Sequence, residues 1–252
     1  MSEWPTSHLG RLPIVQADIE RSARGFVAEA LARRGKGGRP FYSTSANGQV
    51  LALCGKDPEF LALMHKADQI HADGMPMVLY SRYFSKTPLP ERVATTDLVH
   101  AVAEKAAQAG VSFYFLGANE EVNEAAVEKM QERYPNLVFT GRRNGYFSRE
   151  EEAGVIDAIN AAQPDILWVG LGVPLEQRFI DRNIEKLTGV GLIKTSGGLF
   201  DFISDKNARA PEWMQAAGLE WAYRTWLEPR RLAVRYITTN PQAISALFRH
   251  SS

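Results

Sequence analysis

Asp73 is the acidic residue with the most chemical promise, because it follows the short stretch QIHA and precedes a glycine. A carboxylate that ends a strand in an open crevice can accept a proton from a hydroxyl nucleophile. Aspartate at a strand-to-helix junction also commonly caps the helix that follows. Position alone therefore leaves both roles open. His71, two residues earlier, is interpreted as structural, since two residues do not make a metal site.

Glycine-rich segments follow several other apolar stretches of the chain. Glycine lets a backbone approach a ligand closely, and the N-terminus of a following helix offers free N–H groups to phosphate. These segments favour a nucleotide or a sugar nucleotide as the ligand. The glycines concerned are Gly117, Gly170, Gly172, Gly197 and Gly198.

The segment VGLGVP lacks the third glycine of the dinucleotide-binding fingerprint. A tight turn with Pro174 at the first helical position is therefore the favoured interpretation of its glycines. The chain has no G-x-x-x-x-G-K-S/T loop, and no two aspartates stand two residues apart. We therefore expect no P-loop chemistry and no D-x-D metal site, so that a metal-independent mechanism without a cofactor is favoured.

The loop PLPERVATTD contains a further pair of candidates. Arg92 has the planar fork that binds a diphosphate. It can instead form a surface ion pair with Glu91 or Asp97, which contributes little to stability. The sequence leaves these two interpretations equal.

The composition is that of an ordinary globular protein: 252 residues, 45% hydrophobic and 23% charged, with zero formal net charge. No run of about 18 apolar residues and no basic-then-apolar leader occurs, so we expect a cytoplasmic protein. A neutral chain has no general attraction to nucleic acid, and none is expected as a partner. The single cysteine, Cys54, excludes an internal disulfide and is expected to be buried.

Short apolar stretches alternate with amphipathic helical patterns from about residue 14 onward. This alternation predicts an α/β fold with a doubly wound, mainly parallel sheet and helices on both faces. We expect a core over residues 1–205 and a C-terminal helical appendage over residues 206–252. Helix caps are predicted at Thr95 or Thr96 and at Asn119, and a capping box at Ser148 and Glu151. Ligands of such sheets bind outside the carboxyl ends of the strands.

Several segments, in order, resemble motifs of the WecG/TagA/CpsF family of bacterial glycosyltransferases. They are ADGMPMV, PLPERVATTDLV, FLGANEEV, RRNGYF, VGLGVPLEQRFI and, most specifically, GGLFDFISDKNARAPEWMQAAGLEWAYRTWLEPRR. The resemblance runs from about residue 12 to about residue 240. Ser45 replaces the family's threonine, Thr95 or Thr96 stands where glycine is usual, and LEQ replaces K-Q-E.

The resemblance implies an inverting, metal-independent transfer of a sugar from a UDP-sugar to a saccharide on a lipid diphosphate of the undecaprenyl type. It implies that Asp73 is the general base and that Ser45 and Asn47 correspond to the family's T-x-N. The product would extend a bacterial surface polysaccharide. The remaining substrate-binding residues expected from the matched motifs are Gly74, Asp97, Tyr146, Glu176, Gln177, Phe200, Asp201, Arg209, Arg224, Arg230 and Arg231.

The stretch 209–231 concentrates three tryptophans and four arginines. Aromatic and basic residues together suit a helix at a membrane interface, although the same pattern also fits packing on the sheet. The resemblance favours a flap that holds the enzyme peripherally on the cytoplasmic face of the inner membrane. Pro229 is expected to interrupt this helix, and Trp213 and Trp221 are assigned to packing.

Two other functions remain open at this stage. A dinucleotide-dependent oxidoreductase has the same type of sheet, and a non-catalytic membrane adaptor needs only the arginine- and tryptophan-rich segment. Homo-oligomerisation is also possible.

Overall fold

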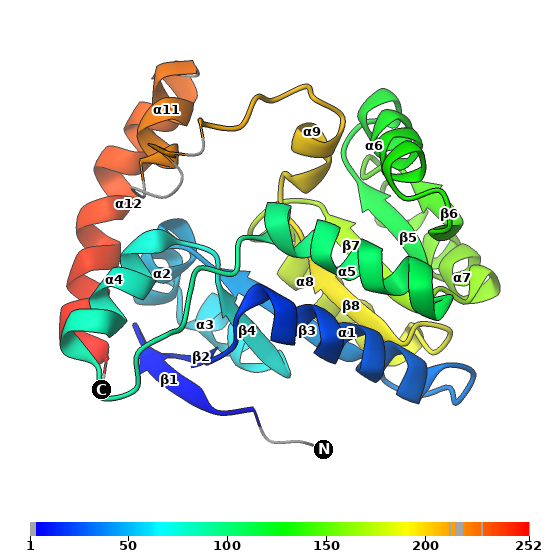
Figure 1. Ribbon diagram of the computed structural model, residues 1–252, viewed down its shortest axis with the longest axis horizontal. Coiled ribbons are helices and arrows are strands. Elements are labelled where there is room, and N and C mark those ends of the chain that lie inside the picture. Colours follow the sequence, from blue (N-terminus) through cyan, green and yellow to red (C-terminus); the bar gives the residue numbers. More distant parts are fainter. Residues whose placement is uncertain (1–3, 212, 215–218, 228, 252) are drawn as a thin grey trace.

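The structure is a computed structural model that describes residues 4–211, 213–214, 219–227 and 229–251, except for the side chains of residues 224, 231, 233 and 235. Its described residues form an eight-stranded sheet of order β1-β2-β4-β3-β8-β7-β5-β6 (Figure 1). β1 and β2 are antiparallel, whereas the remaining neighbours pair in parallel. The strands are β1 (Thr6–Leu9), β2 (Leu12–Val15), β3 (Phe41–Ala46), β4 (Gln69–Ala72), β5 (Ser112–Gly117), β6 (Val138–Arg143), β7 (Ile166–Gly170) and β8 (Leu192–Thr195).

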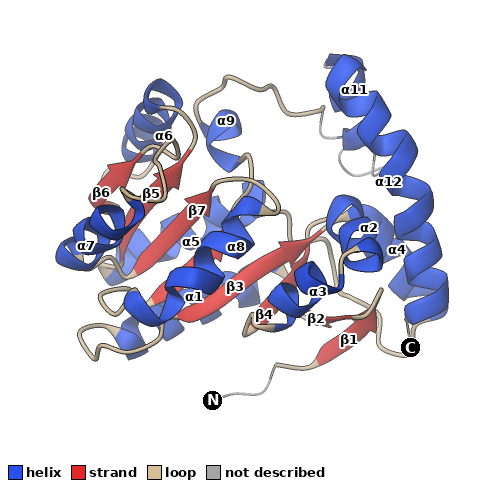
Figure 2. Cartoon of the chain, turned by 180° about the vertical axis from the view of Figure 1, so that it is seen from behind, coloured by secondary structure: helices blue, strands red, loops and turns tan. Residues whose placement is uncertain are grey.

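Helices cover both faces of this sheet, as Figures 1 and 2 show from opposite sides. One apolar cluster joins α1, α5, α6 and α9 to one face, and another joins α7 and α8 to the opposite face. The predicted doubly wound α/β fold is therefore confirmed. The helices are α1 (Ile19–Arg33), α2 (Gly48–Lys56), α3 (Pro58–His65), α4 (Met75–Phe84), α5 (Thr95–Ala109), α6 (Glu120–Arg133), α7 (Glu152–Ala162), α8 (Leu175–Asn183), a 3-10 turn (Ile184–Lys186), α9 (Leu199–Ile203), α11 (Glu220–Leu227) and α12 (Pro229–His250).

The central strands are buried on both faces, which explains why their sequences are continuous apolar runs. Every residue of β5 and β7 is buried, and the Trp168 side chain is fully enclosed. Such strands alternate with helices long enough to cross over the sheet, so the sequence pattern predicts this part of the fold.

The hairpin β1–β2 was not predicted. Its two turn residues, Gly10 and Arg11, both have positive φ angles of 57° and 73°, as a two-residue hairpin turn requires. Asparagine or glycine is usual at both positions, and arginine gives no turn signal. Leu9 and Leu12 pair across the turn and are fully buried.

The predicted helix caps have different outcomes. The side chain of Asn119 accepts the backbone N–H of Val122, which confirms it as a cap, and Ser148 and Glu151 form the expected reciprocal hydrogen bonds. The cap at Thr95 or Thr96 is wrong, because Thr95 is already the first residue of α5 and the preceding Ala94 has no capping side chain. Pro174 likewise precedes α8 instead of opening it.

The C-terminal helices return to the core. α12 packs against α2 and α4, with Ala243 and Leu247 buried in the same apolar cluster as β1, β2 and β4. α11 ends at Leu227 and α12 begins at Pro229; residue 228 lies outside the described residues, so the expected interruption stays a prediction. No helix in the described ranges is both long and apolar enough to span a bilayer. The division of the chain at residue 205 stays a prediction.

Candidate active site

The crossover connections after β5 and after β7 run toward opposite sides of the sheet. α6 leads from β5 outward to β6, whereas α8 leads from β7 back to β8. Open α/β sheets bind ligands at such a reversal, outside the carboxyl ends of the strands. Asp73, Ser45, Gly117, Gly170 and Ser196 lie at or just beyond these ends.

Asp73 directly follows β4 and is held from two sides. Its backbone N–H donates to the carbonyl of Ala46 at 2.8 Å, and its Oδ1 accepts the backbone N–H of Thr95 at 3.0 Å. Asp73 therefore lies at the N-terminus of α5, whose own N-cap residue has no capping side chain. The alternative that it caps the helix that follows it is wrong, because α4 has Gly74 at that position and no side-chain cap.

Burial raises the pKa of the Asp73 carboxyl above its ordinary value. The Thr95 N–H and the positive charges of Lys194 and Arg92 act in the opposite direction, while Glu220 adds to the rise. A carboxylate whose pKa is raised holds a proton more tightly, which is the direction that favours a general base.

Ser45 and Asn47 flank the end of β3. The Ser45 hydroxyl lies 3.3 Å from Thr95 Oγ1 and accepts a hydrogen bond of 2.7 Å from Lys194 Nζ. Asn47 caps α2, since its Oδ1 accepts the N–H groups of residues 49 and 50. A side chain at Gly74 would come within 3.3 Å of Asn47 Cα, so glycine lets the two loops touch.

Lys194 is the site residue that the sequence analysis missed. It lies in β8, is fully buried, and also donates to the carbonyl of Thr195 at 2.9 Å. Burial lowers the pKa of its ammonium group to about 8, and the charges of Asp73 and Glu176 limit that fall. A lysine inside the otherwise apolar stretch GVGLIKT was the available signal.

Glu176 lies at the start of α8 and binds backbone, contrary to its motif's implied contact with the donor. Its Oε2 accepts the N–H groups of Gly172 at 3.2 Å and Gly197 at 2.9 Å. Both N–H groups, expected to be open to a phosphate, are thus occupied by a carboxylate. Burial raises the pKa of Glu176 to about 7. Next to it, the Gln177 Oε1 and Ser196 Oγ atoms are buried without a hydrogen-bond partner among the described residues.

The glycines of β5 and β7 allow two backbones to touch. A Cβ atom at Gly117 would lie 2.3 Å from the Gly170 carbonyl oxygen, and the φ angle of Gly117 is +144°. A Cβ atom at Gly170 would lie 2.9 Å from the ring of Phe200. That ring is buried and stacks on Phe115 at 4.5 Å between centroids. Phe200 thus supports this edge from the core, and Gly198 precedes α9 as its N-cap residue.

A charged cluster connects the loop before α5 to the C-terminal segment. Arg92 lies 2.9 Å from Glu220 of α11 and 3.7 Å from Asp97, and Arg209 lies 2.5 Å from Asp97. Glu91 instead accepts the N–H of residue 19. Because the Arg92 side chain is only 13% exposed, this network is more than a surface ion pair. It places α11 close to Asp73.

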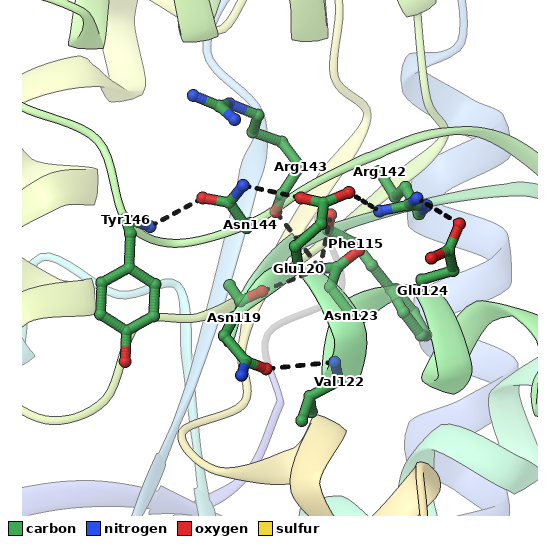
Figure 3. A network of polar contacts seen from close by, with 11 residues as sticks. Phe115, Asn119, Glu120, Val122, Asn123, Glu124, Arg142, Arg143, Asn144 and Tyr146 are labelled. Carbon is green, nitrogen blue, oxygen red and sulfur yellow. Dashed lines mark hydrogen bonds and ion pairs between the residues drawn. The ribbon is translucent and has the colours of Figure 1, made fainter.

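Other expected substrate-binding residues lie farther out. Tyr146 is 78% exposed, and its ring points away from the polar network between α6 and β6 (Figure 3). In that network Arg142 binds Glu120, which also accepts a hydrogen bond from Asn144. Asp201 forms an ion pair with a lysine of the following loop at 3.1 Å.

The arginines and tryptophans of the C-terminal segment are only partly described. Arg230 is exposed, whereas the side chains of Arg224 and Arg231 lie outside the described part of the structure. Trp213 is 66% exposed, so its assignment to packing is wrong. Trp221 is exposed too, although its ring contacts Tyr236.

Two hollows in the surface lie along α7 instead of near Asp73. One is lined by residues including Glu152 and Lys186, the other by residues including Tyr114 and Arg143. None of the catalytic or substrate-binding residues expected from the sequence lines either hollow. The convergence of ionisable groups, and not surface shape, therefore identifies the candidate site.

Comparison with known proteins agrees with this interpretation. The family model described as "Glycosyl transferase WecG/TagA/CpsF family" matches residues 12–252. A relative from Bacillus spizizenii is 29% identical over 94% of this chain and 91% of its own length. Relatives from Bacillus subtilis (30% identical, 75% of this chain, 72% of its own) and Staphylococcus aureus (29%, 76% and 74%) follow. All three are named N-acetylglucosaminyldiphosphoundecaprenol N-acetyl-beta-D-mannosaminyltransferase. The chain belongs to the WecG/TagA/CpsF family and is a glycosyltransferase.

Proposed function

We propose that this glycosyltransferase moves a sugar from a UDP-sugar to a saccharide carried on undecaprenyl diphosphate, with inversion at the anomeric carbon. The observation that carries the proposal is the half-buried Asp73 carboxylate at the end of β4, fixed by the N–H of Thr95. The relatives named above provide the acceptor class, since their names specify a saccharide on diphosphoundecaprenol. Family membership favours this function over an oxidoreductase or an adaptor.

In the proposed reaction Asp73 takes the proton of the acceptor hydroxyl as the oxygen attacks the anomeric carbon. The bond to the leaving oxygen of UDP breaks on the opposite face, which inverts the centre. The products are the extended lipid-linked saccharide and UDP. Positive charge for the departing diphosphate would come from side chains such as Arg92, so the proposal includes metal independence.

Donor recognition is proposed at the β7–β8 side of the edge. The unpartnered Gln177 Oε1 and Ser196 Oγ atoms support this location, because buried polar atoms without partners are costly and a bound ligand can satisfy them. Tight backbone packing at Gly117 and Gly170 keeps side chains out of the same region.

Peripheral attachment to a membrane is proposed for the C-terminal helices. Trp226 is 77% exposed and Ile237 is 73% exposed, and Arg230 is exposed between them in sequence. Exposed aromatic and aliphatic side chains beside cations suit an anionic lipid surface. Homo-oligomerisation stays a prediction.

The test of the proposal is UDP release from a panel of UDP-sugars, with N-acetylglucosamine linked through diphosphate to a short polyprenyl chain as acceptor. Asp73→Asn is the matched control for chemistry, and omission of the acceptor is the control for hydrolysis. We expect acceptor-dependent UDP release with at least one donor, unchanged by EDTA. Absence of release with every donor would contradict the function, whereas loss with EDTA and recovery with magnesium would contradict metal independence alone.

A further inference from the structure

Lys194 places a buried ammonium group in the centre of the sheet. Removing an ammonium from water costs several kcal/mol unless the protein compensates for it. Its two hydrogen bonds go to neutral oxygens, the Ser45 hydroxyl at 2.7 Å and the Thr195 carbonyl at 2.9 Å. These bonds alone are weak compensation for a buried charge. The rest must come from the charged groups around it.

The ionisable groups that face Lys194 come from two elements. β4 contributes His71 and, directly after the strand, Asp73; α8 contributes Glu176. Both carboxyl groups attract the ammonium. His71 is fully buried, and burial together with Lys194 lowers its pKa to about 3, so it adds no positive charge near neutrality. Farther out, Arg92 and Glu220 act on Asp73 with opposite signs.

A continuous chain of contacts also joins Lys194 to Asp73. Lys194 Nζ donates to Ser45, whose hydroxyl lies 3.3 Å from Thr95 Oγ1. The backbone N–H of the same Thr95 donates to Asp73 Oδ1 at 3.0 Å. The three strands β8, β3 and β4 are therefore connected at their carboxyl ends through one hydroxyl pair and the first residue of α5.

We propose that Lys194 is a positioning residue, whose buried ammonium keeps the Asp73 carboxylate ionised and fixes Ser45 and Thr95 beside it. This inference rests on the proposed function of Asp73 as general base, since an ionised carboxylate is the form that accepts a proton. Burial favours the protonated form of Asp73, and Lys194 opposes burial. Without the lysine charge, the pKa of Asp73 would rise further and the base would be protonated over a wider range of pH.

The first experiment is the pH dependence of kcat/KM for the wild type and for Lys194→Met, which keeps the length of the side chain but not its charge. We expect the acidic limb of the profile to move to higher pH by about one unit or more. At the wild-type midpoint a rise of one unit is about a fivefold loss, the loss approaches about tenfold at lower pH, and it shrinks as pH rises. Lys194→Arg, which keeps the charge, should leave the limb in place.

Thr195→Val is the matched control, because it removes a buried polar group from the same strand without removing a charge. A structural defect in β8 lowers the rate equally at every pH in either variant. A folded Lys194→Met protein with an unmoved acidic limb overturns the proposal. If that variant does not fold, Lys194→Gln replaces it, since glutamine still offers a donor to Ser45.

A second measurement does not depend on activity. Carbon-13 NMR titration of labelled aspartate carboxyls, with Asp73→Asn to assign the signal, reports the protonation of Asp73 directly. We expect its midpoint to rise in Lys194→Met and to stay in Thr195→Val. If the wild type transfers no sugar from any UDP-sugar, the proposed function fails while this titration still decides the role of Lys194.

Discussion

The two halves of the sheet's carboxyl edge differ in the groups that they offer to a ligand. The β4–β3–β8 half presents ionisable side chains: Lys194 is fully buried and donates to Ser45, and the half-buried Asp73 accepts the N–H of Thr95. The β7–β5 half presents backbone, because Gly117 and Gly170 touch without side chains between them. The difference indicates a division of labour, in which one half is suited to moving a proton and the other to accommodating a ligand closely.

Loss of the base should give the largest effect on turnover. Asp73→Asn keeps the size of the side chain and an oxygen that can accept the Thr95 N–H, so the fold and UDP binding should persist. We expect kcat to fall by about a hundredfold or more, the usual scale for a general base. UDP release and calorimetric titration with UDP measure the two quantities. A folded variant with near-normal turnover would leave Asp73 as no more than the cap of α5.

The glycine half should be sensitive to shape instead of charge. Gly117→Ala places a Cβ atom 2.3 Å from a backbone oxygen at a φ angle of +144°, and we expect a loss of about 3 kcal/mol or more in the free energy of unfolding. Gly172→Ala is the matched control, because its φ angle is +80° but no atom lies within 4 Å. It should cost about 1 kcal/mol. Equal costs in urea unfolding would show that the close approach at Gly117 is unimportant.

Glu176 lies where the two halves meet, and its ionisation should make the stability of the protein depend on pH. Its pKa is raised from 4.5 to about 7 in the folded state. The folded protein therefore holds the proton more tightly than the unfolded chain, so this stabilising contribution is complete below about pH 4.5 and is lost as pH rises through about 7. Glu176→Gln lacks this titration. The variant should therefore be more stable relative to wild type at pH 8 than at pH 5. We expect the difference in the free energy of unfolding, variant minus wild type, to be about 2 kcal/mol larger at pH 8.

Urea unfolding at both pH values measures this difference. A wild-type-minus-variant difference that stays constant from pH 5 to pH 8 would show that Glu176 is ionised throughout. In that case its carboxylate is fully stabilised by the N–H groups of Gly172 and Gly197.

The smallest effect on chemistry is expected from the exposed C-terminal residues. Trp226→Ser combined with Ile237→Ser should weaken binding to anionic liposomes by about tenfold. Turnover of an acceptor with a short, water-soluble polyprenyl chain should change little. Val138→Ser, which alters an exposed apolar residue on β6, is the control. Liposome flotation that is equal for all three proteins would contradict membrane attachment through this surface.

Sequence patterns predicted the parts of the fold that depend on burial. Strands such as β5 and β7 are continuous apolar runs because both of their faces are covered, and this signal is local in the sequence. The hairpin turn at Gly10 and Arg11 was missed because its backbone conformation is set by pairing with the rest of the sheet, which no short pattern reports.

The candidate site was predicted unevenly for a similar reason. Asp73 was found because its neighbours in sequence mark the end of a strand. Its partners Thr95 and Lys194 are 22 and 121 positions away, and only the parallel register of β4, β3 and β8 brings them together. The occupation of the Gly172 and Gly197 N–H groups by Glu176 likewise depends on two loops meeting in space.

α12 is held at its far end by the hairpin turn. The N–H groups of Arg11 and Gly10 donate to His250 and Ser251 at 3.1 and 3.0 Å. With 22 residues the helix is about 33 Å long, and α11, whose Glu220 binds Arg92, precedes it at its other end. The hairpin, although it contributes no side chain to the site, thus fixes one end of the helix whose other end adjoins α11 and its contact with Arg92.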